Sequence, residues 1–189
     1  MSSAPLLERA AMRVFARDGF EGASMRSIAQ EAGMRASSLY SHFKGKDDLF
    51  LHLISLAFEE ENAYLNTWFS DSNPSNSQER IFAYIRALAH HFEESDSARF
   101  LLSFKFFPPY KHRLAIDSAI RLHERQVLAS LETAYRNVGT GKLSPQDFSE
   151  TTLALIDSLE CELVFGLQNR FSQRCKSAEA ILELVFDGK

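Results

Sequence analysis

The stretch SMRSIAQEAGMRASSLYSHFKGKDDLF, residues 24–50, contains two short apolar patterns of helical period on either side of a glycine. The first pattern consists of Ile28, Ala29 and Ala32, and the second of Leu39, Tyr40 and Phe43. Gly33 lies between them, where a residue without a Cβ adopts the left-handed backbone that ends a helix at no steric cost. The spacing therefore predicts two helices joined by a tight turn, which is the layout of a helix-turn-helix.

The second of these helices, expected over about 36–43, begins with small and polar residues. Ser24 is placed to cap the first helix, and Ser37 or Ser38 to help cap the second. A helix with small residues at its start enters the DNA major groove without steric hindrance. Its free N-terminal amides also attract phosphate. These features predict that the second helix contacts DNA.

Three successive segments carry a family resemblance: LLERAAMRVFARDGF at 6–20, SMRSIAQEAGM at 24–34 and SSLYSHFKGKDDLF at 37–50. They resemble the N-terminal domain of the TetR family of bacterial transcriptional repressors, from residue 6 to about residue 54. The matching positions are Phe15, Gly19, Phe20, Ile28, Ala29, Gly33, Leu39, Tyr40, His42, Phe43, Lys46 and Leu49. The family often has serine or threonine where this chain has Arg35, so either the cap shifts to Ser37 or Arg35 contacts DNA instead of capping.

The resemblance implies an all-α fold with two domains. A three-helix helix-turn-helix DNA-binding domain is expected over residues 1–50, and a larger helical ligand-binding and dimerisation domain over 51–189. The resemblance also implies phosphate contacts from Tyr40, His42 and Lys46, whose side chains can each donate a hydrogen bond. The alternative is that Tyr40 packs inside the fold and His42 is merely exposed.

Other candidate DNA contacts lie at the starts of the two helices. The start of the second helix offers Arg35, Ala36, Ser37 and Ser38 for contact with bases or backbone. Ser24 and Arg26 are placed to approach phosphate at the start of the first helix, although a simple cap and a solvated arginine are the alternatives. Small hydroxyl groups contact many bases, so these residues do not identify the operator.

The composition is that of an ordinary soluble protein, with 45% hydrophobic residues in 189. Residues 1–50 hold seven basic and six acidic residues, whereas 51–189 hold fourteen and nineteen. The net charge of −4 argues against nonspecific coating of nucleic acid. It allows a local basic footprint, because fields act within a Debye length of roughly 8 Å. The candidates for this footprint are Arg26, Arg35, Lys44 and Lys46.

The sequence gives no indication of a membrane segment or of secretion. No apolar run approaches the ~20 residues of a membrane span, and the opening MSSAP lacks the regions of a signal peptide. We therefore expect a cytoplasmic protein without a membrane partner. Cys161 and Cys175 have no C-x-x-C partner, so reduced thiols are expected.

No metal, cofactor or catalytic motif is recognised. Adjacent His90 and His91 point to different helix faces, and His112 and His123 would lie about 16 Å apart along one helix. The chain has no G-x-S-x-G elbow, no glycine-rich phosphate loop and no H-E-x-x-H helix. We expect neither a metal site nor a cofactor, and we expect that the protein is not an enzyme.

Helical patterns continue beyond residue 45, without the alternation typical of a strand. They are predicted over about 46–69, 78–94, 97–107, 111–137, 145–168 and 177–186, with a surface loop over 70–77. The stretch around residues 100–110 is unusually aromatic in a chain with sixteen phenylalanines. Phe100, Phe104, Phe107 and Tyr110 are candidates to line a pocket for a hydrophobic or aromatic ligand, and core packing is the alternative for each of them.

The helix expected over 145–168 is apolar around more than half of its circumference, so it needs partners on two sides. We expect Leu155, Leu159, Leu163 and Gly166 to contribute to a four-helix interface between two copies. Glycine in mid-helix costs about 1 kcal/mol relative to alanine, and close approach by another backbone would explain Gly166. The alternative is a helix buried in the middle of a single domain.

These observations favour a DNA-binding repressor that acts as a homodimer. A two-fold dimer places its two recognition helices about 34 Å apart, so a palindromic double-stranded DNA operator is expected. A small-molecule inducer, hydrophobic or aromatic, would release the DNA by favouring a conformer in which the helix over 46–69 has shifted. The alternatives are a helical binding protein that does not bind DNA and a regulator controlled by a protein partner.

Overall fold

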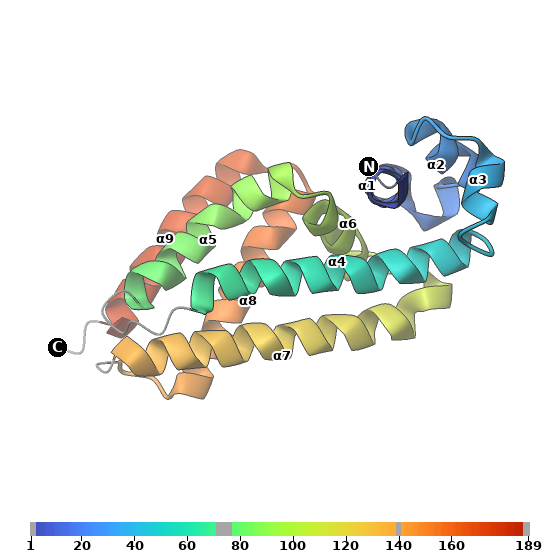
Figure 1. Ribbon diagram of the computed structural model, residues 1–189. Helices are drawn as coiled ribbons and strands as arrows, with labels where there is room; N and C mark the ends of the chain where they lie inside the picture. The colour runs from blue at the N-terminus through green and yellow to red at the C-terminus, as the bar shows by residue number, and fades with distance from the viewer. Residues whose placement is uncertain (1–2, 71–76, 139–140, 187–189) are drawn as a thin grey trace. The chain divides into compact units, whose positions relative to one another are not determined.

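A computed structural model of the chain describes residues 3–70, 77–138 and 141–186, and every regular element within these ranges is helical (Figure 1). The elements are α1 (Ser3–Gly22), α2 (Met25–Glu31), α3 (Ala36–Tyr40), α4 (Lys46–Phe69), α5 (Ser77–Glu94), α6 (Asp96–Phe106), the 3-10 turn η2 (Tyr110–His112), α7 (Arg113–Val138), α8 (Pro145–Val164) and α9 (Gln168–Phe186). The all-α prediction is confirmed. Most of the loop expected over 70–77 lies outside the described residues.

The helices form two compact units, and each unit is built from two separate stretches of chain. Unit 1 consists of Met1–Glu61 and Glu94–Ile120, and unit 2 of Asn62–Glu93 and Arg121–Lys189. Helices α4 and α7 each continue from one unit into the other. The predicted boundary after residue 50 separates a DNA-binding domain from a ligand-binding and dimerisation domain. The two packing units do not test this division of function, which stays a prediction. None of the described helices is both long and apolar enough to cross a bilayer.

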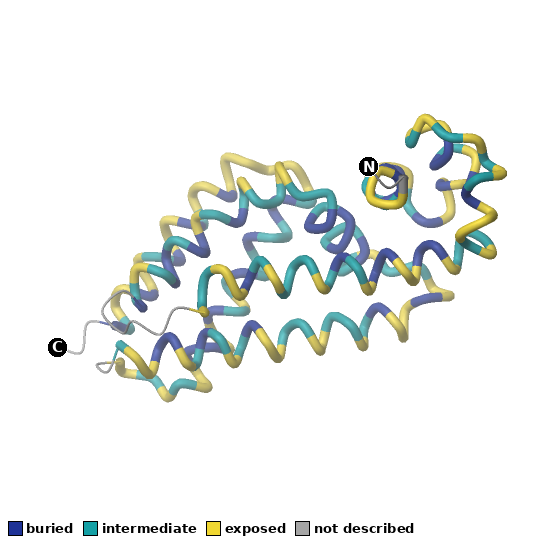
Figure 2. Tube along the Cα trace, in the orientation of Figure 1, coloured by how far each residue is buried: buried dark blue, intermediate teal, exposed yellow. Residues whose placement is uncertain are grey.

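The core of unit 1 is a cluster of aromatic rings contributed by α1, α4 and α6. The ring of Phe50 lies 5.1 Å from that of Phe15 and 4.9 Å from that of Phe104, and Phe100 lies 5.2 Å from Phe104. In Figure 2, buried residues recur along the first half of α4 and over α6. Burying a phenylalanine side chain stabilises the fold by roughly 1.5–3 kcal/mol. Edge-on contacts between rings add a further, smaller stabilisation to that of burial. Helix α6 is therefore part of the core that supports the helix-turn-helix.

The core of unit 2 includes a stack of two rings and a third ring against them. Tyr135 lies parallel to Phe148 at 4.0 Å, and Phe186 packs 5.3 Å from Phe148. The hydroxyl of Tyr135 donates to the carbonyl of Leu143 and accepts from its N–H, at 3.2 and 3.1 Å. This buried ring therefore secures the segment that leads into α8.

The helix expected over 145–168 ends two residues before Gly166, as α8. Gly166 has φ 67°, its N–H donates to the carbonyl of Leu163 at 3.1 Å, and the N–H of Leu167 donates to that of Glu162 at 2.9 Å. These two bonds form a Schellman motif, which ends a helix. The expectation that Gly166 lies in mid-helix is therefore wrong. A Cβ at this position would meet no described neighbour within 4 Å, so the left-handed backbone explains the glycine.

Helix α9 begins at Gln168, directly after this turn and well before the expected start near residue 177. Its apolar residues do not all face one way, since Leu182 and Phe186 are buried whereas Ile181 and Leu184 are exposed. The buried pair contributes to the core of unit 2. The exposed pair is left on the outer face of the helix.

Candidate nucleic-acid interface

Helix α2 begins with a reciprocal cap at Ser24. The Ser24 hydroxyl accepts from the N–H of Ser27, and the Ser27 hydroxyl accepts from the N–H of Ser24, both at 3.0 Å. This capping box satisfies two amides that the helix cannot pair internally. The predicted capping role of Ser24 is confirmed.

The turn between α2 and α3 is fixed by Gly33, which has φ 65°. The N–H of Gly33 donates to the carbonyl of Gln30 at 3.1 Å, and the N–H of Met34 donates to that of Ala29 at 2.8 Å. This is a second Schellman motif, and it sets the direction in which α3 leaves the turn. The predicted role of Gly33 is confirmed.

Helix α3 is shorter than expected and has no side-chain cap. Arg35 is its N-cap residue, with extended backbone and no capping hydrogen bond. The expectation that Ser37 or Ser38 caps this helix is wrong, because both lie inside the first turn. The helix ends at Tyr40, since two successive N–H groups beyond it, of His42 and Phe43, both donate to the carbonyl of Leu39.

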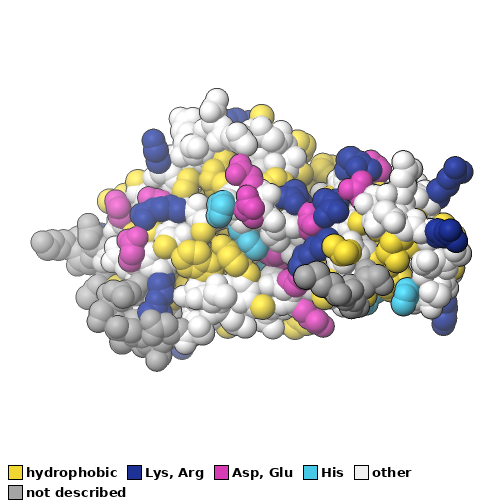
Figure 3. Space-filling model, turned by 45° about the horizontal axis from the view of Figure 1, so that its top comes forward, with side chains coloured by type: hydrophobic (Ala, Val, Ile, Leu, Met, Phe, Trp, Pro, Cys, Tyr) yellow, Lys and Arg dark blue, Asp and Glu magenta, His cyan; other side chains and the backbone are white. Residues whose placement is uncertain are grey.

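Most of the predicted DNA contacts point away from the core. The exposed residues are Ser24, Arg26, Arg35, Ser37, Tyr40 and His42, and the half-buried ones are Ala36, Ser38 and Lys46. Tyr40 is 59% exposed, so the alternative in which it packs inside the fold is not found. Leu39 is fully buried and anchors α3. Figure 3 shows basic side chains standing out at the end of unit 1 where α2 and α3 lie.

Lys46 makes internal contacts that the sequence does not indicate. Its ammonium group donates to the carbonyls of Phe20 and Ala23, at 2.7 and 3.1 Å, and lies 4.4 Å from the centre of the Phe20 ring. Hydrogen bonds from a charged donor are among the stronger ones in proteins. Lys46 therefore ties the start of α4 to the last turn of α1 and to the residue that follows it, and one of its three donors remains for another partner.

The first turn of α4 is also bonded to the η2 turn, which directly precedes α7. The carboxylate of Asp47 accepts from Lys111 Nζ at 2.8 Å and from His112 Nε2 at 2.6 Å. The Lys111 ammonium, and secondarily the His112 ring, hold the pKa of Asp47 below its ordinary value. His112 is buried, with its ring 4.9 Å from that of Phe20 and 5.4 Å from that of Phe50. Partners so far apart in sequence could not be paired from the sequence.

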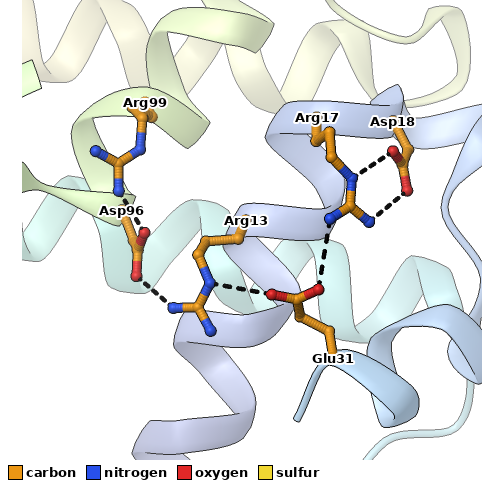
Figure 4. Close-up of polar contacts among 6 residues, drawn as sticks. All are labelled: Arg13, Arg17, Asp18, Glu31, Asp96 and Arg99. Atoms are coloured by element: carbon orange, nitrogen blue, oxygen red, sulfur yellow. Dashed lines mark hydrogen bonds and ion pairs between the residues drawn. The ribbon is translucent and has the colours of Figure 1, made fainter. Parts of the chain in front are cut away.

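A chain of ion pairs links α6, α1 and α2 on the surface of unit 1 (Figure 4). Its members are, in spatial order, Arg99, Asp96, Arg13, Glu31, Arg17 and Asp18. Arg13 bridges two helices, with contacts of 2.9 Å to Asp96 and 3.4 Å to Glu31. The Asp18 carboxylate raises the pKa of Arg17, and Arg17 lowers the pKa of Asp18. Exposed pairs contribute little energy individually, so this network chiefly orients α2 relative to α1 and α6.

The structure does not bring the four candidate ligand-binding residues together. Phe100 and Phe104 are buried in the core of unit 1, as in the core-packing alternative. Phe107 and Tyr110 are exposed. A stretch of aromatic residues can supply a core as readily as a pocket, and the sequence alone does not distinguish these uses. Their role in ligand binding stays a prediction.

The candidate dimer residues are distributed between core and surface. Leu159 and Leu163 are buried within unit 2, Leu155 is half-buried, and Gly166 is exposed. The larger exposed apolar side chains nearby are Phe165, Leu167, Ile181 and Leu184, which belong to the two apolar C-terminal patterns expected to form the interface. Helical period identifies an apolar face, but it does not show which neighbour covers that face.

Residues 7–53 match the family model described as "Bacterial regulatory proteins, tetR family". The chain is also 32% identical over 80 residues to "Probable HTH-type transcriptional regulator YttP" of Bacillus subtilis (strain 168). This match covers 42% of the chain and 38% of the length of that relative. The family model thus matches the part of the chain that holds the helix-turn-helix.

Solved structures extend the similarity of fold to nearly the whole chain. A TetR transcription regulator from Haloarcula marismortui superposes with a TM-score of 0.78 at 17% identity, covering 97% of each chain. FadR from Bacillus subtilis, solved in complex with stearoyl-CoA, gives a TM-score of 0.70 at 15% identity and covers 98% of this chain and 99% of FadR. Residues 7–53 thus match the TetR family of bacterial regulatory proteins, and nearly the whole chain shares its fold with a solved structure described as a TetR transcription regulator.

Proposed function

We propose that this protein binds a double-stranded DNA operator and regulates transcription as a repressor. The observation that carries the proposal is the geometry of α3. Leu39 is fully buried beneath it, while Arg35, Ser37 and Tyr40 are exposed. A short helix that is anchored to the core by one buried side chain and carries polar side chains on its exposed face suits insertion into a major groove.

The contacts are divided between bases and backbone. Arg35 makes no cap hydrogen bond, so its guanidinium is a candidate for bidentate contact with guanine. Ala36, Ser37 and Ser38 approach the groove with it. Tyr40 and His42 donate to phosphates, as do Ser24, Arg26 and the remaining donor of Lys46; such contacts position a protein on DNA without reading the sequence.

Replacing Arg35 with glutamine tests this assignment on DNA selected from genomic fragments by the purified protein. We expect operator affinity to fall by about 1–3 kcal/mol, the discrimination typical of a bidentate base contact. Affinity for unrelated DNA should change much less. The measurement is the dissociation constant on both DNAs at one salt concentration, because affinities at different salt are not comparable.

Arg136→Gln is the matched control, since it removes the same charge from an exposed position in α7. It should leave both affinities unchanged. Equal losses on operator and unrelated DNA would assign Arg35 to phosphate. A wild-type protein that retards no DNA fragment would overturn the proposed function itself.

The protein is proposed to act as a homodimer, with α8 and α9 supplying the interface. Phe165, Ile181 and Leu184 are exposed apolar side chains on or beside these helices, and they supplement the predicted Leu155, while Leu159 and Leu163 support the helix from within. A two-fold dimer reads two half-sites about one DNA turn apart. The selected DNA should therefore contain palindromic half-sites at that spacing.

We further propose that a small hydrophobic or aromatic ligand relieves repression. Unit 2 contains rings of Tyr64, Trp68 and Tyr84 in mutual contact. The indole N–H of Trp68 is buried, and no hydrogen-bond partner for it is found among the described residues. Buried donors are almost always satisfied, so a ligand acceptor is a suitable partner. FadR, solved with stearoyl-CoA, shares this fold.

A compound that releases the operator is expected to change the fluorescence of Trp68, which is the only tryptophan in the chain. The measurement is a titration of hydrophobic compounds, followed by tryptophan emission and by operator retention in parallel. The two curves should share one midpoint. Release with unchanged emission would place the ligand elsewhere. Operator binding that no compound relieves would favour control by a protein partner.

A further inference from the structure

Residues 110–114, which comprise the η2 turn and the first two residues of α7 and are called the α6–α7 segment below, carry two highly exposed large apolar side chains. Tyr110 is 95% exposed and Leu114 is 82% exposed. Lys111 and Arg113 have side chains 67% and 66% exposed. Two cations and an exposed tyrosine thus lie within five consecutive residues, and the DNA-binding assignment above uses none of them.

This segment is held in a fixed shape despite its exposure. Pro109 has extended backbone angles, and its carbonyl accepts from the N–H of His112 at 3.0 Å. His112 is buried against Phe20 and donates to Asp47 at 2.6 Å. The buried histidine therefore anchors the turn while the residues on either side of it project outward. Side chains displayed on an anchored turn lose little entropy on binding.

The anchoring point is close to the proposed DNA contacts. Asp47 belongs to the first turn of α4, immediately after Lys46, and Lys111 Nζ lies 2.8 Å from its carboxylate. Both segments belong to unit 1, together with α3. In Figure 1, the start of α7 lies beside the start of α4, at the end of unit 1 that carries α3.

The charges at this place suit an anionic partner. The ion pair of Lys111 with Asp47 is solvent-exposed on both sides, and the ammonium group has further N–H donors with which to bind a second anion while it keeps Asp47. Arg113 has a longer contact, 3.8 Å to Asp117. Arginine, lysine and tyrosine are all common donors to DNA phosphates. A duplex seated on α3 is the anion that this unit is otherwise built to meet.

We infer that the α6–α7 segment is a second DNA-backbone contact, in which Arg113, Lys111 and Tyr110 bind phosphates flanking those reached from α3 and the start of α4. This inference rests on the proposed function. This contact increases the affinity for DNA and fixes the position of the protein along the duplex. It contributes no preference for one sequence over another. It makes residues 110–113 part of the DNA-binding surface although they lie outside the helix-turn-helix.

The test is the salt dependence of DNA binding by full-length Arg113→Gln. Each phosphate contact that is lost reduces the slope of log affinity against log salt by about 1. We expect this reduction on operator and on unrelated DNA alike, together with loss of hydroxyl-radical protection at the flanking phosphates. Arg113 is preferred to Lys111 for this test because removing Lys111 would also expose the charge of Asp47.

Arg125→Gln is the matched control, because it removes the same charge from the same helix about 18 Å further along. It should leave the slope unchanged. Arg113→Lys keeps the charge and should retain the wild-type slope. If Arg113→Gln binds with the wild-type slope and footprint, the inference is overturned and the proposed function stands. If the wild type binds no DNA, the proposed function fails, and the inference with it.

Discussion

Replacing Phe100 with alanine is expected to destabilise unit 1 by about 3–5 kcal/mol, the usual cost of removing a buried phenyl ring. Phe100 is fully buried, and its ring lies 5.6 Å from that of Phe50 and 6.1 Å from that of Phe15. The alanine leaves a cavity beneath the helix-turn-helix, although the substitution is in α6. Urea denaturation should show an earlier midpoint, and operator affinity should fall as the native fraction falls.

Phe107→Ala is the control, because it makes the same chemical change at the end of the same helix. Phe107 is 62% exposed, so its loss should change stability by no more than about 0.5 kcal/mol. Equal effects of the two substitutions would contradict the core assignment. A Phe100→Ala protein of native stability that no longer responds to ligand would return Phe100 to the predicted pocket.

Removing Arg170 and Arg174 together is expected to destabilise unit 2 by about 3–5 kcal/mol, since it leaves a buried carboxylate without compensation. Glu162 in α8 is 3% exposed, and its Oε1 contacts Arg174 at 2.8 Å and Arg170 at 3.2 Å, both from α9. Its other oxygen is buried, with no hydrogen-bond partner among the described residues. The measurement is the free energy of unfolding of the double alanine variant.

Glu162→Leu supplies the decisive comparison. Replacing a buried charged group with an apolar one of similar size is often neutral or stabilising, and the unpartnered oxygen of Glu162 makes this outcome more favourable here. Combined with the two arginine substitutions, Glu162→Leu should restore most of the lost stability. If Glu162→Leu alone costs as much as the double arginine change, the ion cluster itself stabilises the fold, and the desolvation of Glu162 does not outweigh its ion pairs.

The helix-turn-helix could be predicted from the sequence because its determinants are local. Gly33 follows a helical pattern and precedes another, and the polar residues around it mark the turn. Gly166 has the same backbone and the same pair of hydrogen bonds, yet it lies within the apolar run LVFGL. There the apolar pattern continues through the turn, so the end of the helix cannot be recognised from the sequence.

The other differences between prediction and structure arise from long-range packing. Phe100 and Phe104 complete a core begun by Phe15 and Phe50, and no local pattern reveals that pairing. The same holds for the contact between His112 and Asp47. Arg35 stands at the N-cap of α3 without a side-chain hydrogen bond, and the cap has not shifted to Ser37. The other alternative, a contact of Arg35 with DNA, stays a prediction.

The interleaved construction of unit 1 has a consequence for protein engineering. A chimera that grafts only residues 1–61 onto a foreign regulatory core would leave the rings of Phe15 and Phe50 without the two phenylalanines that cover them. A single splice after the first half of α4 therefore cannot transfer the folded helix-turn-helix unit intact. Transplantation requires two exchanges, with residues 94–120 moved alongside the N-terminal segment.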